Sequence, residues 1–242
     1  MQPLLRAHSL TPRAADHVGR PATAAESLFA TVTKSAFNSM AVRSSVVDFV
    51  APTPGFLVYV EATRLSYLVN EFEPIVFTAL DACTHLQVAR LYFTGTTASA
   101  IDFAEFAFSK FPFPVLQMRT TQEAPFYDTL DLPTRQRFSE FLRNHKVQHS
   151  VMSNPLHDDL YPHLSQFTFG RMAAGSLNMI SSDELLEGFS SYLLIHNNHR
   201  ELPALEGRTP LQKLQTFKRF SHLPSFDPFA MPSFNRATTQ LP

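Results

Sequence analysis

The stretch FLVYVEATRLSYLVNEFEPIVFTALDACTHLQVARLYF, residues 56–93, decides the fold class of this chain. It contains three segments rich in β-branched and aromatic residues, which begin at Phe56, Pro74 and Leu86 and are separated by short polar breaks. Segments of this kind are typical of neighbouring antiparallel strands. The sequence APTPG at residues 51–55 precedes the first segment and is typical of a turn.

Helical and extended patterns alternate after this stretch. Residues 96–111 have apolar side chains at helical spacing, and Thr96 or Thr97 is a suitable N-cap. A strand is predicted over residues 115–120, a helix over Thr134 to His145, and a fifth strand over residues 147–152. The order β-β-β-α-β-α-β predicts an α/β fold, in which helices flank a mixed five-stranded sheet.

The rest of the chain divides into an N-terminal part and two C-terminal parts. We predict an arm at residues 1–50 with a possible short helix from Ala24, a core at 51–175, a helical extension at 176–222 and an irregular tail at 223–242. In the extension, Ser182 is predicted to cap a helix that buries Leu185, Leu186, Phe189 and Leu193. Thr209 is predicted to cap a second helix, with Pro210 in its first turn.

Composition limits the possible functions. The chain has 242 residues, is 44% hydrophobic and has a formal net charge of −1, so it can bury one sizeable core. A balanced charge argues against a strong, autonomous DNA binder, because such proteins usually carry a basic stripe. The single cysteine, Cys83, cannot form an intrachain disulfide and favours a reducing compartment, so we expect a cytoplasmic protein. No apolar run approaches the roughly 20 residues that cross a bilayer, so no membrane partner is expected.

Four phrases of the sequence, in order, resemble one family. They are PGFLVYVEATRL from Pro54, IVFTALDACTHLQVARLYFTGTTASAIDF from Ile75, FPFPVLQMRTTQEAPF from Phe111 and YLLIHNNHRELPALEGRTPLQKL from Tyr192. Together they resemble the integrase core of insertion-sequence transposases and retroviral integrases, which is ribonuclease-H-like. The resemblance covers about residues 54–215. Arg200 and the turn from Gly207 to Pro210 match family residues that we interpret as structural.

The resemblance also implies a site, and this chain departs from it. Family members hold two divalent metal ions with two Asp on neighbouring strands and one Glu on the following helix, and the metals drive phosphoryl transfer. These positions fall on Glu61, Thr121 and Pro162. Glutamate keeps the charge but is one methylene longer, a hydroxyl is a poor substitute for a bridging carboxylate, and proline offers no ligand. We therefore expect a catalytically inactive core that needs no metal cofactor.

An alternative hypothesis is that the chain retains metal-dependent catalytic activity. Glu61, Glu123 and Asp159, with Asp158 beside it, are acids at or near the expected positions. If they converged on Mg²⁺ or Mn²⁺, the chain would be an active transposase or nuclease. The simpler interpretation makes Glu123 a solvated loop acid and Asp159 a helix cap. Asp81 is interpreted as a turn residue in the family's Asp-x-x-Thr sequence.

Other chemistries have weaker support in the sequence. His145 and His149, with His157 and His163 downstream, could suggest zinc, but the first pair spans a helix end and a strand rather than one helical face. His145 is better explained by the dipole at a helix C-terminus. The sequence contains no G-x-S-x-G and no phosphate-binding glycine loop.

A further hypothesis is that the chain binds nucleic acid without cleaving it. Arg208, Lys213, Lys218 and Arg219 occur with no acid between Glu206 and Asp227. They could touch phosphates weakly or serve as a DNA-binding regulator's contacts, or they could simply be a solvated helix face. We also expect a possible homodimer, or a mixed dimer with a related transposase, through the helix that carries Ile101 to Phe111.

Overall fold

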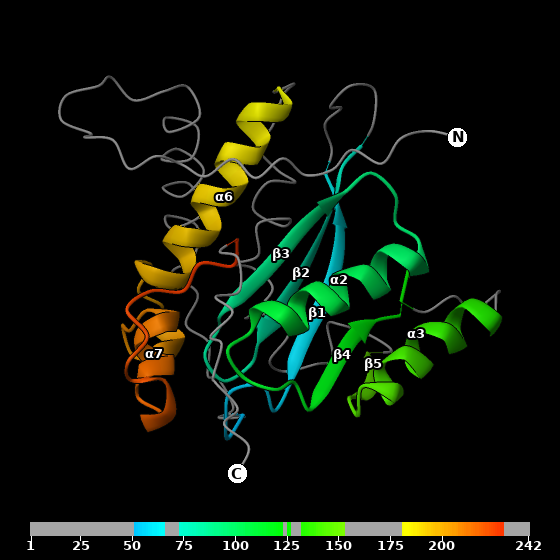
Figure 1. Cartoon of the computed structure of the whole chain (residues 1–242). Helices are drawn as coiled ribbons and strands as arrows, with labels where there is room; N and C mark the ends of the chain where they lie inside the picture. Colours follow the sequence, from blue (N-terminus) through cyan, green and yellow to red (C-terminus); the bar gives the residue numbers. More distant parts are fainter. Residues whose placement is uncertain (1–50, 66–72, 123–124, 127–131, 153–180, 230–242) are drawn as a thin grey trace, which may run out of the picture.

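A five-stranded mixed sheet forms the centre of the protein (Figure 1). The computed structural model describes residues 51–65, 73–122, 125–126, 132–152 and 181–229. The strand order is β3-β2-β1-β4-β5, in which β1 pairs antiparallel with β2 and parallel with β4. The strands are β1 (Val58–Arg64), β2 (Ile75–Asp81), β3 (Gln87–Tyr92), β4 (Gln117–Thr121) and β5 (Gln148–Met152). The predicted α/β class and order of elements are therefore confirmed.

Helices cover both faces of this sheet. The helix α2 (Thr97–Lys110) connects β3 to β4, and α3 (Leu132–Asn144) connects β4 to β5. Both lie on one face, whereas α6 (Ser182–Asn198) packs on the other face beside β3 (Figure 1). The C-terminal part continues through η2 (Pro203–Leu205), α7 (Pro210–Gln215) and η3 (Lys218–Phe220).

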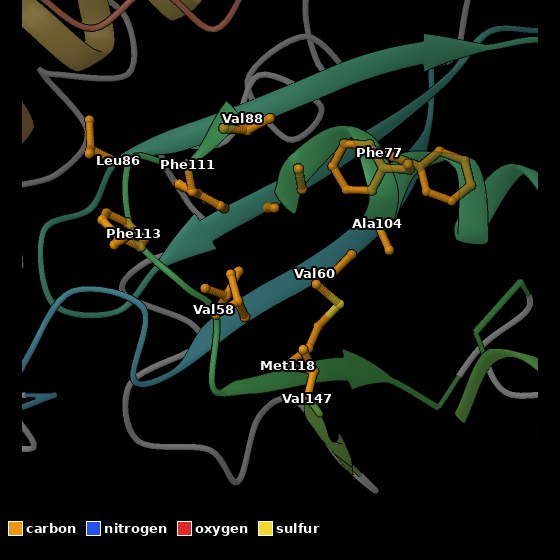
Figure 2. Close-up of a cluster of buried hydrophobic side chains, with 14 of the residues drawn as sticks. Val58, Val60, Phe77, Leu86, Val88, Ala104, Phe111, Phe113, Met118 and Val147 are labelled. Carbon is orange, nitrogen blue, oxygen red and sulfur yellow. The ribbon is translucent and has the colours of Figure 1, made fainter. Parts of the chain in front are cut away.

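Strand alternation divides the buried residues between the two faces. On β1, Val58 and Val60 belong to the large cluster beneath α2, which Figure 2 shows in close-up. Phe77 lies in the middle of this cluster and contacts several rings, among them Phe103 at 5.6 Å and Phe126 at 5.7 Å between ring centroids. Nine of the described phenylalanines are buried and contribute much of the core, because each buried ring removes a large apolar area from water.

The helix starts follow the capping rules, with one correction. Thr96 caps α2 by accepting a hydrogen bond from Ser99, and Thr209 caps α7 in a capping box. The cap of α6 is Ser181 rather than the predicted Ser182, because Glu184, three residues after Ser181, completes the capping box. The predicted burial of Leu186 is also wrong, since this side chain is 51% exposed.

Side chains of α6 cover the outer edge of β3. The amide of Asn197 accepts a hydrogen bond from Gln87 N at 2.8 Å and donates one to Gln87 O at 2.9 Å. It thereby pairs with the backbone groups that a further strand would bind, which protects the edge. None of the helices in the described residues is long and apolar enough to span a membrane.

The remaining sequence predictions lie outside the described residues. They include the arm at residues 1–50 with its helix from Ala24, and most of the tail at 223–242.

Candidate functional site

The two central parallel strands bring together two of the three positions that the sequence singled out. Val60 on β1 pairs with Thr120 on β4, so Glu61 and Thr121 are the next residues on the two neighbouring strands. Both are buried, at 5% and 8% exposure. Glu61 lies across from Thr78 on β2. The Thr78 hydroxyl is buried and has no hydrogen-bond partner among the described residues.

The guanidinium group of Arg119 lies on the same face of the sheet as Glu61 and Thr121. Arg119 precedes Thr121 by two residues and pairs in register with Tyr59, which precedes Glu61 by two. Its Nη1 donates to Tyr59 Oη at 3.5 Å and its Nε to Ser150 Oγ at 3.2 Å. The guanidinium carbon lies 5.7 Å from the centre of the Tyr59 ring. The sequence predictions did not include Arg119, although strand alternation around Thr121 indicates that it shares this face.

Tyr192 of α6 and Arg200, two residues after the end of that helix, also lie near this face. Arg200 Nη1 donates to Tyr192 Oη at 3.3 Å, and its guanidinium carbon lies 5.2 Å from the ring centre. Burial raises the pKa of Tyr192 to about 12, and the charge of Glu61 acts in the same direction while Arg200 opposes it. Tyr192 is therefore within electrostatic reach of both an acid and a guanidinium group. Arg200, interpreted from sequence as structural, is 8% exposed and belongs to this network.

The side chains around Glu61 and Thr121 do not fit as ligands of a pair of divalent metal ions. Magnesium and manganese ions bind anionic oxygen atoms at short distance, and a two-metal site needs several carboxylates. At the two neighbouring strand positions the chain provides one carboxylate, at Glu61, and one neutral hydroxyl, at Thr121. Arg119 adds a positive charge to the same face. Among the residues that the structure describes, no group of three or more His, Cys, Asp or Glu side chains could hold a metal ion.

The third family position and the alternative acids are not placed. Pro162, Glu123, Asp158 and Asp159 all lie outside the described residues, as do His157 and His163. The alternative site from Glu61, Glu123 and Asp159 therefore stays a hypothesis.

Asp81 is a turn residue, as its Asp-x-x-Thr sequence indicated. Its carboxylate accepts hydrogen bonds from Gly55 N at 2.8 Å, Thr84 N at 2.8 Å and Thr84 Oγ1 at 2.7 Å. Burial raises the pKa of Asp81 to about 6, although these donors oppose the rise. Gly55 has a φ of 79°, in the left-handed region that favours glycine. Asp81 thus ties the entrance of β1 to the turn between β2 and β3.

His145 and His149 do not form a pair for zinc. His145 Nδ1 lies 2.9 Å from Phe141 O, which is the helix-end contact expected for this residue. The two nitrogens of His149 bind hydroxyl groups instead, Nε2 at 3.0 Å from Thr120 Oγ1 and Nδ1 at 2.8 Å from Ser139 Oγ. Burial lowers the pKa of His149 to about 4, so the ring is neutral near pH 7.

The four basic residues that the sequence singled out lie at another part of the molecule. Arg208 forms an exposed ion pair with Glu206 at 3.4 Å. Lys218 and Arg219 are exposed in η3, and Lys213 of α7 is partly exposed. The η3 segment packs through Phe220 onto Phe113, with ring centroids 6.1 Å apart, just before β4 begins. Lys218 and Arg219 therefore lie near the end of the sheet where β4 starts.

Comparisons with known proteins agree with the fold. No protein-family model matches the sequence, and no curated protein matches it. A chain of the simian T-cell lymphotropic virus intasome, solved with PP2A regulatory subunit B56 gamma, has a TM-score of 0.51 at 14% identity and is matched over 72% of this chain and 56% of that chain. The present chain thus spans little more than half of that intasome chain.

Two integrase core domains are also similar. The HTLV-2 integrase catalytic core domain, in complex with magnesium, has a TM-score of 0.48 at 15% identity over 67% of this chain and 98% of that one. The BIV core domain has a TM-score of 0.49 at 14% identity over 69% and 98%. The match to the intasome chain shows that this chain has the same ribonuclease-H-like fold. At this level of identity the likeness concerns the fold.

Proposed function

We propose that this chain is an integrase-fold protein that does not cut or join DNA, and that it acts through contacts with proteins or weak contacts with DNA. It is either a remnant of a transposase or a fold reused for binding. No metal cofactor is needed for such a role. A homodimer, or a mixed dimer with a related transposase through α2, is part of the same proposal, as is a cytoplasmic location.

One observation carries this proposal. Glu61 and Thr121 are the residues that follow the Val60–Thr120 pair on the two neighbouring strands, so the second position offers a hydroxyl rather than a carboxylate, and Arg119 is on the same face. Phosphoryl transfer by this fold depends on positive charge supplied by metals between carboxylates. Here a fixed guanidinium and a single acid replace that arrangement, so the local charge no longer favours two bound cations.

A nicking experiment tests the proposal against the alternative active enzyme. Purified protein is incubated with supercoiled plasmid and Mg²⁺ or Mn²⁺, and nicked and linear forms are measured. We expect no metal-dependent cleavage. Cleavage that is lost in Glu61→Gln, Glu123→Gln or Asp159→Asn, but retained in the surface control Asp102→Asn, would overturn the proposal and establish the relocated acids as the site.

A restoration experiment approaches the same question from the other side. The triple variant Glu61→Asp, Thr121→Asp and Pro162→Glu returns the three family residues to their positions. We expect it to bind Mn²⁺, measured by calorimetry or by electron paramagnetic resonance of the free ion, at least ten-fold more tightly than the natural chain. Measurable binding by the natural chain that is as tight as that of the variant, or tighter, would show that it already has a metal site.

A further inference from the structure

The topology of the sheet collects several chain segments at one end. The parallel strands β1, β4 and β5 all begin at this end, and α2 and α3, which run back between them, end there. Gln148 N at the start of β5 donates to Leu116 O just before β4, and Leu116 N donates to Gly55 O just before β1. We call this end the strand-start end. Glu61 and Thr121 lie further along the strands, beyond the Val60–Thr120 pair.

The C-terminal elements cover part of the same end. Phe220 of η3 packs against Phe113 between α2 and β4, and Leu211 and Leu214 of α7 join the same buried cluster as Leu86. Figure 1 shows α7 on the side where α2 ends and β4 begins. Segments that are about 70 residues apart in the sequence, 141–152 and 207–226, are thereby placed along one end of the sheet.

Both of these segments are basic. Neither residues 141–152 nor residues 207–226 contain an Asp or a Glu, although the whole chain has 21 acids against 20 Lys and Arg. The exposed or partly exposed cations that they bring to the strand-start end are Arg143, Lys146, Lys213, Lys218 and Arg219. The near-neutral total charge of the protein therefore conceals a positive end, which the sequence-level balance did not reveal.

Helix dipoles account for only part of this set. Arg143 is in the last turn of α3 and Lys213 in the last turn of α7, where cations are favoured for structural reasons. Lys218 and Arg219 lie in a short 3-10 segment, outside any α-helix.

Lys146 is the most informative residue of the set. Its φ is 59°, a left-handed conformation at the end of α3 where glycine or asparagine is usual. A lysine is strained in this backbone conformation, whereas glycine adopts it without strain. Lysine at this position therefore does not increase the stability of the fold. Its charge is the property that glycine would remove.

We propose that the strand-start end binds the phosphate backbone of double-stranded nucleic acid through Arg143, Lys146, Lys213, Lys218 and Arg219. The exposed acid Asp227 directly follows the second segment and lies near Lys110 at the end of α2, so this end also carries a negative charge. The five cations outnumber that acid and complement a regular row of phosphates. This surface does not include Glu61 or Thr121, so the inference extends the proposed function and does not depend on whether the chain cuts DNA.

The test uses the full chain and a fluorescently labelled 20-base-pair DNA duplex of random sequence, with binding measured by anisotropy between 50 and 200 mM salt. Affinity should fall steeply with salt, because each phosphate contact releases counterions. Lys146→Gly, and the double variant Lys218→Gln with Arg219→Gln, should each weaken binding several-fold to about ten-fold and flatten the salt dependence by about one unit of log–log slope per cation removed. Arg64→Gln is the matched control, since Arg64 is exposed at the far end of β1.

Lys146→Gly also separates binding from folding. Because it relieves a left-handed lysine, its thermal midpoint should equal or exceed that of the natural chain. A binding defect in a variant that is at least as stable therefore comes from the lost charge. The inference is overturned if neither set of variants changes affinity, if Arg64→Gln weakens binding equally, or if vesicles rich in phosphatidylserine bind more tightly than the duplex. Plasmid nicking is scored separately, so its outcome bears only on the proposed function.

Discussion

Glu61 and Asp81 are both buried acids on the central strands, and their surroundings give them different roles. Asp81 is fully buried and accepts hydrogen bonds from two backbone N–H groups and one hydroxyl. Asp81 of β2 pairs with Val58 at the start of β1, whereas Glu61 lies further along β1. The face of the sheet at Glu61 also carries Arg119 and lies near Tyr192 of α6. The first arrangement fixes a turn, whereas the second places one acid on the same face as a guanidinium group and a tyrosine.

The contacts of Asp81 lead to a prediction about stability. Asp81→Ala should lower the free energy of unfolding by about 2–4 kcal/mol, because the donors of Gly55 and Thr84 would be buried without partners. Urea denaturation measures the change. As a control, Asp102→Ala removes an exposed ion pair with Arg90 and should cost about 1 kcal/mol or less. Equal losses in the two variants would contradict the structural role given to Asp81.

At the scale of elements, α6 is attached to the sheet partly through polar groups. Asn197 pairs with the backbone of Gln87, and His196 Nε2 lies 3.0 Å from His85 O. Apolar contacts from Leu185, Phe189 and Leu193 complete the attachment. The apolar periodicity of the helix was readable from sequence, but the partner of Asn197 was not, because Gln87 is 110 residues away.

The second prediction concerns this attachment. Asn197→Leu should lower the free energy of unfolding by about 2–4 kcal/mol, since both backbone groups of Gln87 lose their partner in a buried position. Native-state hydrogen exchange should show faster exchange of the Gln87 amide. The exposed Ser191→Ala on the same helix is the control and should leave both quantities nearly unchanged. Unchanged protection of Gln87 in Asn197→Leu would be inconsistent with the edge-covering role.

At the scale of the whole molecule, histidines in buried or half-buried positions make the fold sensitive to acid. Burial lowers the pKa of His85 and His149 to about 4 and that of His196 to about 3, from an ordinary 6.5. Because the folded-state values are lower, unfolding takes up protons, and stability present above pH 6.5 is lost as the pH falls towards 4. Asp81 changes the stability in the opposite direction as the pH falls. Burial raises its pKa to about 6, so folding favours its protonated form below that pH.

The third prediction follows from this balance. Three histidines lose protons on folding, whereas Asp81 gains one. Unfolding should therefore take up about two protons between pH 6 and 4.5, which corresponds to roughly 3 kcal/mol of lost stability per pH unit. Urea titrations at several pH values measure the slope. His149→Gln should reduce it by about one proton. Stability that stays constant from pH 7 to 4.5 would refute the assignment of neutral buried histidines.

The sequence by itself determined the order of strands and helices, two of the three helix caps, and the turn role of Asp81, because these depend on local periodicity and on residues close together in the chain. It also singled out Glu61 and Thr121, which the structure places on neighbouring strands. Only the tertiary structure set Arg119 against Tyr59, Tyr192 beside Arg200, and His149 between Ser139 and Thr120. Those contacts join residues that strand pairing and helix packing bring together, and no local pattern encodes which distant partner a buried polar group will meet. The positive strand-start end arose in the same way, since its cations are dispersed along the chain and only the parallel topology gathers them.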